Sequence, residues 1–313
     1  MTVSRPHALA KEKGIALITV MLVLAVVAVA LMSMSSERQM DTRRTENQLR
    51  SLQAWQTVYE IEAWAMHVLK VDGKAKKYDA LTEAWHKPLT TKTIALGSIQ
   101  AQIDDLQGRI NLNNLIVDNA PDKESIDQLK RLFVNLDLKP ALVDAIVDWI
   151  DSNMDVQGAQ GAEDDYYSRL SPPYRTANVA IAEVSEVLKI RGITPVVYNT
   201  IQPYIYVSSH FEAININTAS IEVLRTLAPD IKKKDAESIY KASGKPFNEI
   251  EQFLEDEAMI GIAVNKKRLT VASQQFLLSG QIDMGNKALR FQSQLSRDDL
   301  GKVSLIKRVR KGV

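Results

Sequence analysis

The stretch GIALITVMLVLAVVAVALM, from Gly14 to Met32, decides the fold class because it has the character of a membrane-spanning helix. The stretch has about 19 residues and no charged side chain. A helix of that length spans roughly 28 Å, close to the ~30 Å hydrocarbon core of a bilayer. Thr19 is the only polar side chain, so the stretch lacks the polar stripe that a core helix of a soluble protein shows. The sequence therefore predicts that this segment enters a membrane.

The residues after this stretch argue against a secretory signal peptide, which has a shorter apolar region and a small-x-small cleavage site. The apolar run passes directly into the polar segment SMSSERQMDTRRTENQ, and no proline occurs between Pro6 and Pro88. We therefore expect one helix that continues well past the membrane. Its apolar face is expected to contain Trp55, Tyr59, Ile61, Trp64, Met66 and Leu69. A plain single-pass anchor is the alternative at this point.

A short polar leader, residues 1–14, ends in Lys11-Glu12-Lys13-Gly14 directly before the apolar run. Charged residues, a glycine and an uninterrupted apolar helix resemble the class III signal of type IV pilins and pseudopilins. The resemblance implies that a prepilin peptidase cuts between Gly14 and Ile15, methylates the new amino terminus and leaves the helix on the protein. It also implies a single-pass inner-membrane protein with its C-terminal bulk in the periplasm. This orientation rests on the resemblance alone, since basic residues lie on both sides of the span and the positive-inside rule does not decide it.

Thr19, the fifth residue after that cut, departs from the pilin pattern, in which most members carry glutamate. A carboxylate in hydrocarbon is costly unless it is paired, so a subunit with no neighbour above it gains by lacking one. The departure resembles the K-type minor pseudopilins of type II secretion systems and implies a place at the fibre tip. The alternative is an ordinary threonine that bonds its own helix backbone.

The rest of the chain predicts an α+β fold: a pilin-like antiparallel sheet domain behind the N-terminal transmembrane helix, with a large all-helical insertion. Alternating patterns predict a strand or hairpin at 93–105 and three strands at 276–283, 288–295 and 302–309. The sequence between about Lys123 and Leu269 is mostly helical in pattern. The expected organisation is a leader at 1–14, a transmembrane helix at 15–34, a pilin-like domain at 35–110 and 270–313, and an inserted domain at 111–269. A large insertion of this kind also resembles the K-type pseudopilins.

Two segments of the predicted insertion repeat one pattern, in which asparagine and aliphatic residues alternate before a helix. They are GRINLNNL from Gly108 and AININTAS from Ala213, and Asn or Ser is a good helix N-cap. The second segment resembles a helix-hairpin-helix unit, which makes a DNA-binding membrane protein the rival from another functional class. Its hairpin, however, contains Pro229, which lacks an amide hydrogen, and Asp230, which repels phosphate. We therefore interpret the unit as a packing scaffold.

An acidic segment, DAIVDWIDSNMDVQGAQGAEDDYYSRLSPPY from Asp144 to Tyr174, contains the densest chemistry of the chain. Calcium takes 6–8 oxygen ligands, and six carboxylates packed without a counter-ion would repel one another. The opening Asp151-Ser152-Asn153-Met154-Asp155 is that of an EF-hand loop, but Val156 stands where the turn glycine should be, so the loop is not an EF-hand. The pattern DWID…GAEDDYY…PPY resembles the K-type pseudopilins, which implies calcium bound by Asp151, Asp155, Glu163, Asp164 and Asp165. A solvated acidic loop is the alternative, and Asp148 is expected to face the helix instead.

Composition excludes several functional classes. The chain of 313 residues has 39 basic and 38 acidic side chains, which does not suit a protein held on nucleic acid by a broad basic face. Cysteine is absent and the four histidines are scattered, so thiolate chemistry and HExxH metal sites are excluded, and we expect no enzyme. The resemblance implies a minor pseudopilin whose partners are I- and J-type pseudopilins, the inner-membrane assembly platform, the prepilin peptidase and membrane lipid, with no nucleic acid. A minor pilin of a related type IV pilus-like fibre is the closest alternative.

Overall fold

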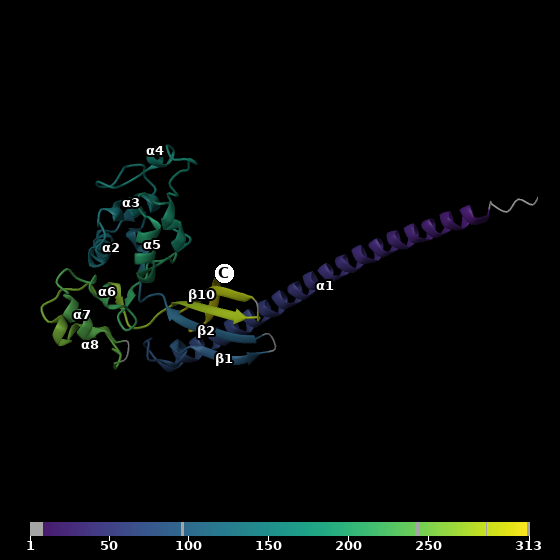
Figure 1. Ribbon diagram of the computed structural model, residues 1–313. Helices are drawn as coiled ribbons and strands as arrows, with labels where there is room; N and C mark the ends of the chain where they lie inside the picture. Colours follow the sequence, from purple (N-terminus) through teal and green to yellow (C-terminus); the bar gives the residue numbers. More distant parts are fainter. Residues whose placement is uncertain (1–8, 95–96, 242–243, 286, 312–313) are drawn as a thin grey trace, which may run out of the picture. The chain divides into compact units, whose positions relative to one another are not determined.

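The computed structural model describes residues 9–94, 97–241, 244–285 and 287–311 (Figure 1). The chain divides into two compact units, Met1–Val58 and Tyr59–Val313. Residues 1–8, the greater part of the predicted leader, lie outside the described residues.

Helix α1 (Leu9–Ala75) is 67 residues long and continues from the first unit into the second. Its side chains from Ile15 to Met32 are all exposed, and within the described ranges it is the one helix long and apolar enough to cross a membrane. The prediction of one continuous helix is confirmed. The predicted apolar face was wrong at Tyr59, which is 47% exposed. The buried apolar side chains of this part are Ile61, Ala65 and Leu69, spaced four residues apart.

The second unit contains a five-stranded antiparallel sheet with the order β1-β2-β9-β10-β11. Its strands are β1 (Leu89–Ile94), β2 (Gly97–Asp105), β9 (Gln275–Asp283), β10 (Ala288–Arg297) and β11 (Val303–Lys311). The predicted C-terminal strands are confirmed, and the predicted N-terminal strand or hairpin is the β1–β2 hairpin, with Leu89 opposite Ala101. Strands β2 and β9 pair directly, from Ser98 opposite Asp283 to Asp105 opposite Phe276. The whole insertion therefore leaves and re-enters the sheet at neighbouring strands.

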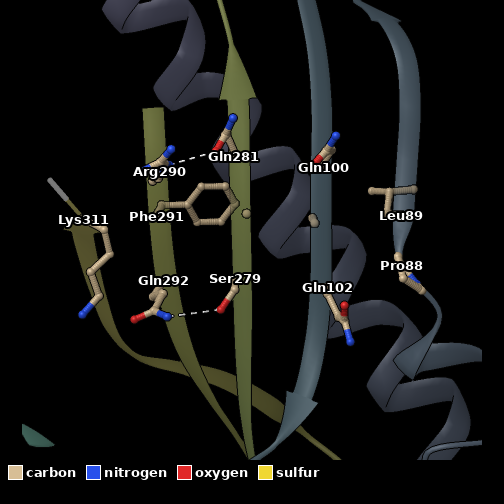
Figure 2. A pocket seen from close by; sticks show the side chains of 12 residues that line it. Pro88, Leu89, Gln100, Gln102, Ser279, Gln281, Arg290, Phe291, Gln292 and Lys311 are labelled. Carbon is tan, nitrogen blue, oxygen red and sulfur yellow. Dashed lines mark hydrogen bonds between the residues drawn. The ribbon is translucent and has the colours of Figure 1, made fainter. Parts of the chain in front are cut away.

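The two faces of this sheet differ in chemistry because side chains alternate along each strand. One face buries Ile99, Ile103, Leu278, Phe291 and Leu295. The opposite face, here named the open face, carries glutamine and serine in register across β2, β9 and β10, as Figure 2 shows with α1 behind the sheet. A groove of about 390 Å³ lies on the open face.

Glu62 on α1 joins the helix to the last two strands. Its Oε1 accepts hydrogen bonds from Ser293 Oγ on β10 at 2.5 Å and from Arg308 Nε on β11 at 2.7 Å. Glu62 is only 3% exposed, and the guanidinium of Arg308 also lies 4.6 Å from the centre of the Tyr59 ring. The carboxylate thus fixes the end of α1 on the buried face of the sheet.

The insertion between β2 and β9 is built mainly from short helices and 3-10 turns. The α-helices are α2 (Lys123–Asn135), α3 (Leu142–Ile150), α4 (Asp164–Tyr167), α5 (Pro195–Ile201), α6 (Ile221–Leu224), α7 (Lys233–Ile239) and α8 (Ile250–Leu254). The 3-10 helices are η2 (Leu112–Leu115), η3 (Val184–Lys189), η4 (Gln202–Tyr204), η5 (Glu257–Met259) and η6 (Lys266–Arg268), while η1 (Ala84–His86) precedes β1. One contiguous core, with Leu129, Phe133, Tyr167 and Phe253 among its fully buried members, holds these elements together.

Three pairs of two-residue strands also occur in the insertion, which is therefore not purely helical. They are β3 (Ile110–Asn111) with β6 (Ile205–Tyr206), β4 (Ile116–Val117) with β5 (Ala120–Pro121), and β7 (Ile214–Asn215) with β8 (Leu269–Thr270). The two parallel pairs begin in the two Asn-containing repeats. Sequence patterning did not show these strands because two residues are too few for a detectable period.

Candidate metal centre

Helix α3 and the loop after it position the first acidic side chains of the candidate metal centre. Asp148, in the last turns of α3, is fully buried and accepts hydrogen bonds from the backbone N–H of Gln157 at 3.0 and 3.2 Å. Asp151 is the C-cap residue directly after α3, and it is only 2% exposed. Both carboxylate oxygens of Asp151 make no hydrogen bond with the described part of the chain.

The glycines of the loop allow its backbone to lie against the α3 carboxylates. A Cβ on Gly161 would overlap Asp148 Oδ2 and the carbonyl oxygen of Gln157. Gly158 adopts φ +56°, and a Cβ there would overlap the Asp144 carboxylate, which pairs with Lys130 at 2.8 Å. The two glycines in the sequence GAQGAED therefore serve close packing of the loop onto α3.

Glu163 completes a buried acidic group with Asp148 and Asp151. It immediately precedes α4, is 3% exposed, and its two carboxylate oxygens make no hydrogen bond within the described residues. Burial raises the pKa of Glu163 to about 7, with a further contribution from the charges of Asp148 and Asp151. Burial likewise raises the pKa of Asp148 to about 6 and raises the pKa of Asp151. Four buried carboxylate oxygens that make no hydrogen bond within the described residues are unusual in a folded protein, because such groups are normally hydrogen-bonded.

The other predicted ligands lie elsewhere on the same loop. Asp155 is exposed, and its backbone N–H donates to Asn153 Oδ1 at 2.7 Å. Asp164 accepts from the backbone N–H and the hydroxyl of Thr176 at 3.0 and 2.8 Å, and Asp165 is exposed. The structure thus brings Asp151 and Glu163 together with Asp148, and it leaves the other three predicted ligands outside this buried group.

The donor set at Asp151 and Glu163 fits a hard cation. It consists of oxygen atoms alone, it is anionic, and its four oxygens make no hydrogen bond within the described residues, although Asn153 lies near Asp151 and Thr176 lies near Glu163. A bound cation would remove the like-charge repulsion that helps to raise the pKa of Glu163.

A second carboxylate group, Asp72, Asp79 and Glu83, was missed by the sequence analysis. Their ligand oxygens lie within 4.8 Å of one another. Burial raises the pKa of Asp79 to about 7 and that of Asp72 to about 6. Two basic residues already occupy this group: Lys76 binds Glu83 at 2.6 Å, and Arg297 binds Asp79. It is therefore a buried ionic network at the end of α1.

The two asparagine repeats stabilise the insertion through backbone contacts. Asn111 caps η2 and Ser220 caps α6, as their patterns predicted. Beyond capping, Asn217 binds both the N–H and the C=O of Phe247, and Asn113 binds both groups of Ile181. These side-chain amides hydrogen-bond to the backbone of segments distant in sequence and so hold those segments together. Local sequence patterns do not reveal this role.

The predicted processing residues lie in α1. Gly14 and Ile15 are helical, and the side chain of Ile15 is 63% exposed. The hydroxyl of Thr19 donates to the carbonyl oxygen of Ala16 at 2.9 Å, the local bond expected of a threonine in a membrane helix.

The whole chain is similar to known proteins of one family. Family models described as type II secretion system protein K match residues 108–210 and 214–272. The type II secretion system protein K of Pseudomonas aeruginosa is 31% identical over 95% of this chain and 92% of its own length. That of Aeromonas hydrophila is 32% identical over 68% of this chain and 69% of its own length.

A solved structure shares the fold. It is the crystal structure of the GspK-GspI-GspJ complex from the type 2 secretion system of enterotoxigenic Escherichia coli, matched with a TM-score of 0.76 and 23% identity over 86% of this chain and the full matched chain. The match shows that this mixed α+β fold, with its antiparallel sheet and helical insertion, is shared with a solved structure. The family models and the relatives together show that this chain belongs to the type II secretion system protein K family, the K-type minor pseudopilins.

Proposed function

We propose that this minor pseudopilin stands at the tip of a periplasmic pseudopilus and supports export of folded proteins across the outer membrane. The observation that carries the proposal is that the two ends of α1 differ in their surroundings. Its part from Ile15 to Met32 exposes only apolar side chains and Thr19, whereas its last part is fixed to the sheet by Glu62. A subunit of this kind offers an apolar helix for packing with similar helices in a membrane or a fibre.

The lack of a carboxylate at position 19 supports the tip position. Thr19 leaves the apolar segment without a charge that would require a partner from a neighbouring subunit. A glutamate at this position would require one, since an unpaired charge at the centre of a bilayer costs about 2.5–3.5 kcal/mol. The I- and J-type pseudopilins are the proposed direct partners, by analogy with the complex that the matched crystal structure contains.

Processing by a prepilin peptidase provides the test of this proposal. The intact mass and N-terminal sequence of the membrane-extracted protein are measured with and without the peptidase. We expect a chain that begins at methylated Ile15 only when the peptidase is present. A chain that keeps Met1 under both conditions would contradict the proposed assembly route, and an unimpaired secretion of exoproteins after deletion would contradict the proposed role.

We also propose that calcium binds at the acidic loop, with Asp151 and Glu163 as the central ligands of the predicted set. The support is their four buried oxygens, which make no hydrogen bond within the described residues. When bound, the ion would supply positive charge and hold the loop on α3. Titration of the full-length protein in detergent with calcium, by calorimetry, tests this: we expect binding that Asp151→Asn weakens strongly and that Asp165→Asn, at an exposed position, weakens less. Equal affinity in Asp151→Asn and the wild type would contradict the assignment.

A further inference from the structure

A small cavity lies between the open face of the sheet and the helical insertion. It has a volume of about 140 Å³ and is bounded by Gln292 and Gln294 of β10, by β11, and by Arg109 and Tyr198 of the insertion. The cavity adjoins the open-face groove, because Gln292 and Lys311 line both. Figure 2 shows these two side chains on neighbouring strands.

Arg109 enters this cavity without a partner. Its guanidinium makes no hydrogen bond and no ion pair within the described residues, although it carries five N–H donors. The acidic groups whose charge acts on it are Asp104 and Asp105. Asp105 is already saturated, since it accepts from Thr218, Asn215, Ser273 and the backbone of Gln107. Burial lowers the pKa of Arg109, and a guanidinium nevertheless stays charged in proteins.

The other charged groups of the cavity do not supply the missing anion. Glu183 is the carboxylate among the lining residues, and it forms an ion pair with Lys307. Lys311 adds a further positive charge at the mouth. Arg109, Lys307 and Lys311 against Glu183 leave an excess of two positive charges.

The size and geometry of the cavity select the kind of anion. A guanidinium presents a planar fork that matches a carboxylate in two parallel hydrogen bonds. A cavity of about 150 Å³ in another protein takes up one benzene molecule, so this volume suits a carboxylate on a short carbon stem and excludes a nucleotide. The amides of Gln292 and Gln294 line the same space and can donate to a second oxygen.

We propose that this cavity is a carboxylate-binding site in which Arg109 is the principal ligand and Lys311 contributes long-range attraction. The carboxylate belongs either to a free small acid or to an acidic side chain of a protein that lies along the open face. The site is distinct from the acidic loop and does not depend on the proposed place of the chain in a fibre.

Binding to the full-length protein in detergent tests the proposal, measured by calorimetry and by the shift in unfolding temperature. The probes are glutarate, the peptide acetyl-Ala-Glu-Glu-Ala-amide, its Gln-Gln counterpart, and inorganic phosphate. We expect glutarate or the acidic peptide to bind, with a Kd that rises with salt, and the Gln-Gln peptide not to bind. Binding of the acidic peptide alone identifies a protein side chain as the ligand, and binding of glutarate alone identifies a free acid.

Variants assign the binding to the cavity. Arg109→Gln is expected to weaken carboxylate binding about tenfold to a hundredfold, because it removes charge-assisted hydrogen bonds. Lys311→Gln, at an exposed position at the end of β11, is expected to weaken it about threefold. Arg290→Gln is the matched control: Arg290 lies on the same open face but outside the cavity, bonded to Gln281, and its loss should leave binding unchanged.

Three results would overturn the proposal. The first is that neither carboxylate probe binds. The second is that the wild type, Arg109→Gln and Lys311→Gln bind the carboxylate with equal affinity. The third is that the protein binds phosphate in preference to a carboxylate. If Arg109→Gln fails to fold, Lys311→Gln and the salt dependence still decide the outcome.

Discussion

Removing Arg297 tests the buried ionic network at the end of α1. Arg297 donates to Asp79 and, at 2.7 Å, to the carbonyl oxygen of Ser273, and its guanidinium lies 5.0 Å from the centre of the Phe276 ring. In Arg297→Ala the carboxylate of Asp79, which is 1% exposed, loses its only ion-pair partner in the described chain. Breaking a buried pair from one side costs about 3–5 kcal/mol, so we expect a loss of that size at pH 8.

The pH dependence of this loss follows from the pKa of Asp79. In the wild type, burial raises this pKa to about 7 although Arg297 lowers it. Without Arg297 the folded-state pKa rises further, so folding of the variant favours the protonated form over a wider pH range. Above pH 7 the variant should therefore lose about 1.4 kcal/mol per pH unit relative to the wild type, until Asp79 ionises. At pH 5, where Asp79 is protonated in both proteins, the loss should be smaller.

Urea unfolding in detergent, followed by the fluorescence of Trp85, measures both effects. Trp85 packs edge-on against Phe276, with ring centres 5.5 Å apart, and so reports on this region. Arg290→Ala, on the same strand but exposed, is the control and should change the unfolding free energy by less than about 0.5 kcal/mol. Equal stability of the two variants, or a loss from Arg297→Ala that does not grow with pH, would refute the reasoning.

Three further changes probe other parts of the chain. Wild-type stability should fall as pH rises from about 5 to 8. The folded-state pKa values of Asp72 (about 6) and Asp79 (about 7) are raised, so the stability that their protonated forms contribute is lost as the pH rises through these values. Urea midpoints that stay constant across this range would contradict this prediction. Gly108→Ala places a Cβ 2.6 Å from the carbonyl oxygen of Thr218, and this overlap should lower the unfolding free energy by more than about 1 kcal/mol. Gly244→Ala is the control, because among the described residues its Cβ meets only Lys241, at 3.8 Å. Thermal unfolding of both variants separates the steric overlap from a general effect of alanine. Phe291→Ala removes a ring that is 1% exposed and covers Gly280, and should cost about 3–5 kcal/mol in urea unfolding; a cost below 1 kcal/mol would show that the sheet collapses to fill the space.

Local patterns predicted the elements of the fold that depend on local sequence. The alternation in residues 276–309 predicted β9, β10 and β11, because one face of each strand is buried and the other is polar. The apolar run and the absence of breakers predicted α1. The buried face of α1 was assigned partly wrongly, because large aromatic residues were favoured and a small residue, Ala65, lies fully buried instead.

Contacts between distant residues could not be predicted in this way. Arg297 and Asp79 are 218 positions apart, and nothing near either residue indicates the pair. Arg109 was noticed only as part of a repeat, because its lack of a partner is a property of the cavity. At the acidic loop, the sequence indicated a segment rich in carboxylates, and the calcium site predicted there stays a prediction. It did not distinguish buried Asp151 and Glu163 from exposed Asp155 and Asp165, since all four stand in similar polar surroundings along the chain.

The direct pairing of β2 with β9 has a mechanical consequence. The insertion is tethered at Asp105 and Gln275, which lie at the same end of these two antiparallel strands. A force that draws the insertion away from the sheet therefore peels the strands apart from that end, so their hydrogen bonds are loaded one after another. The buried bonds that Asp105 accepts from Ser273, Asn215 and Thr218 lie where such peeling would start. They hold the two strands together at the end from which the insertion departs, and so resist such peeling.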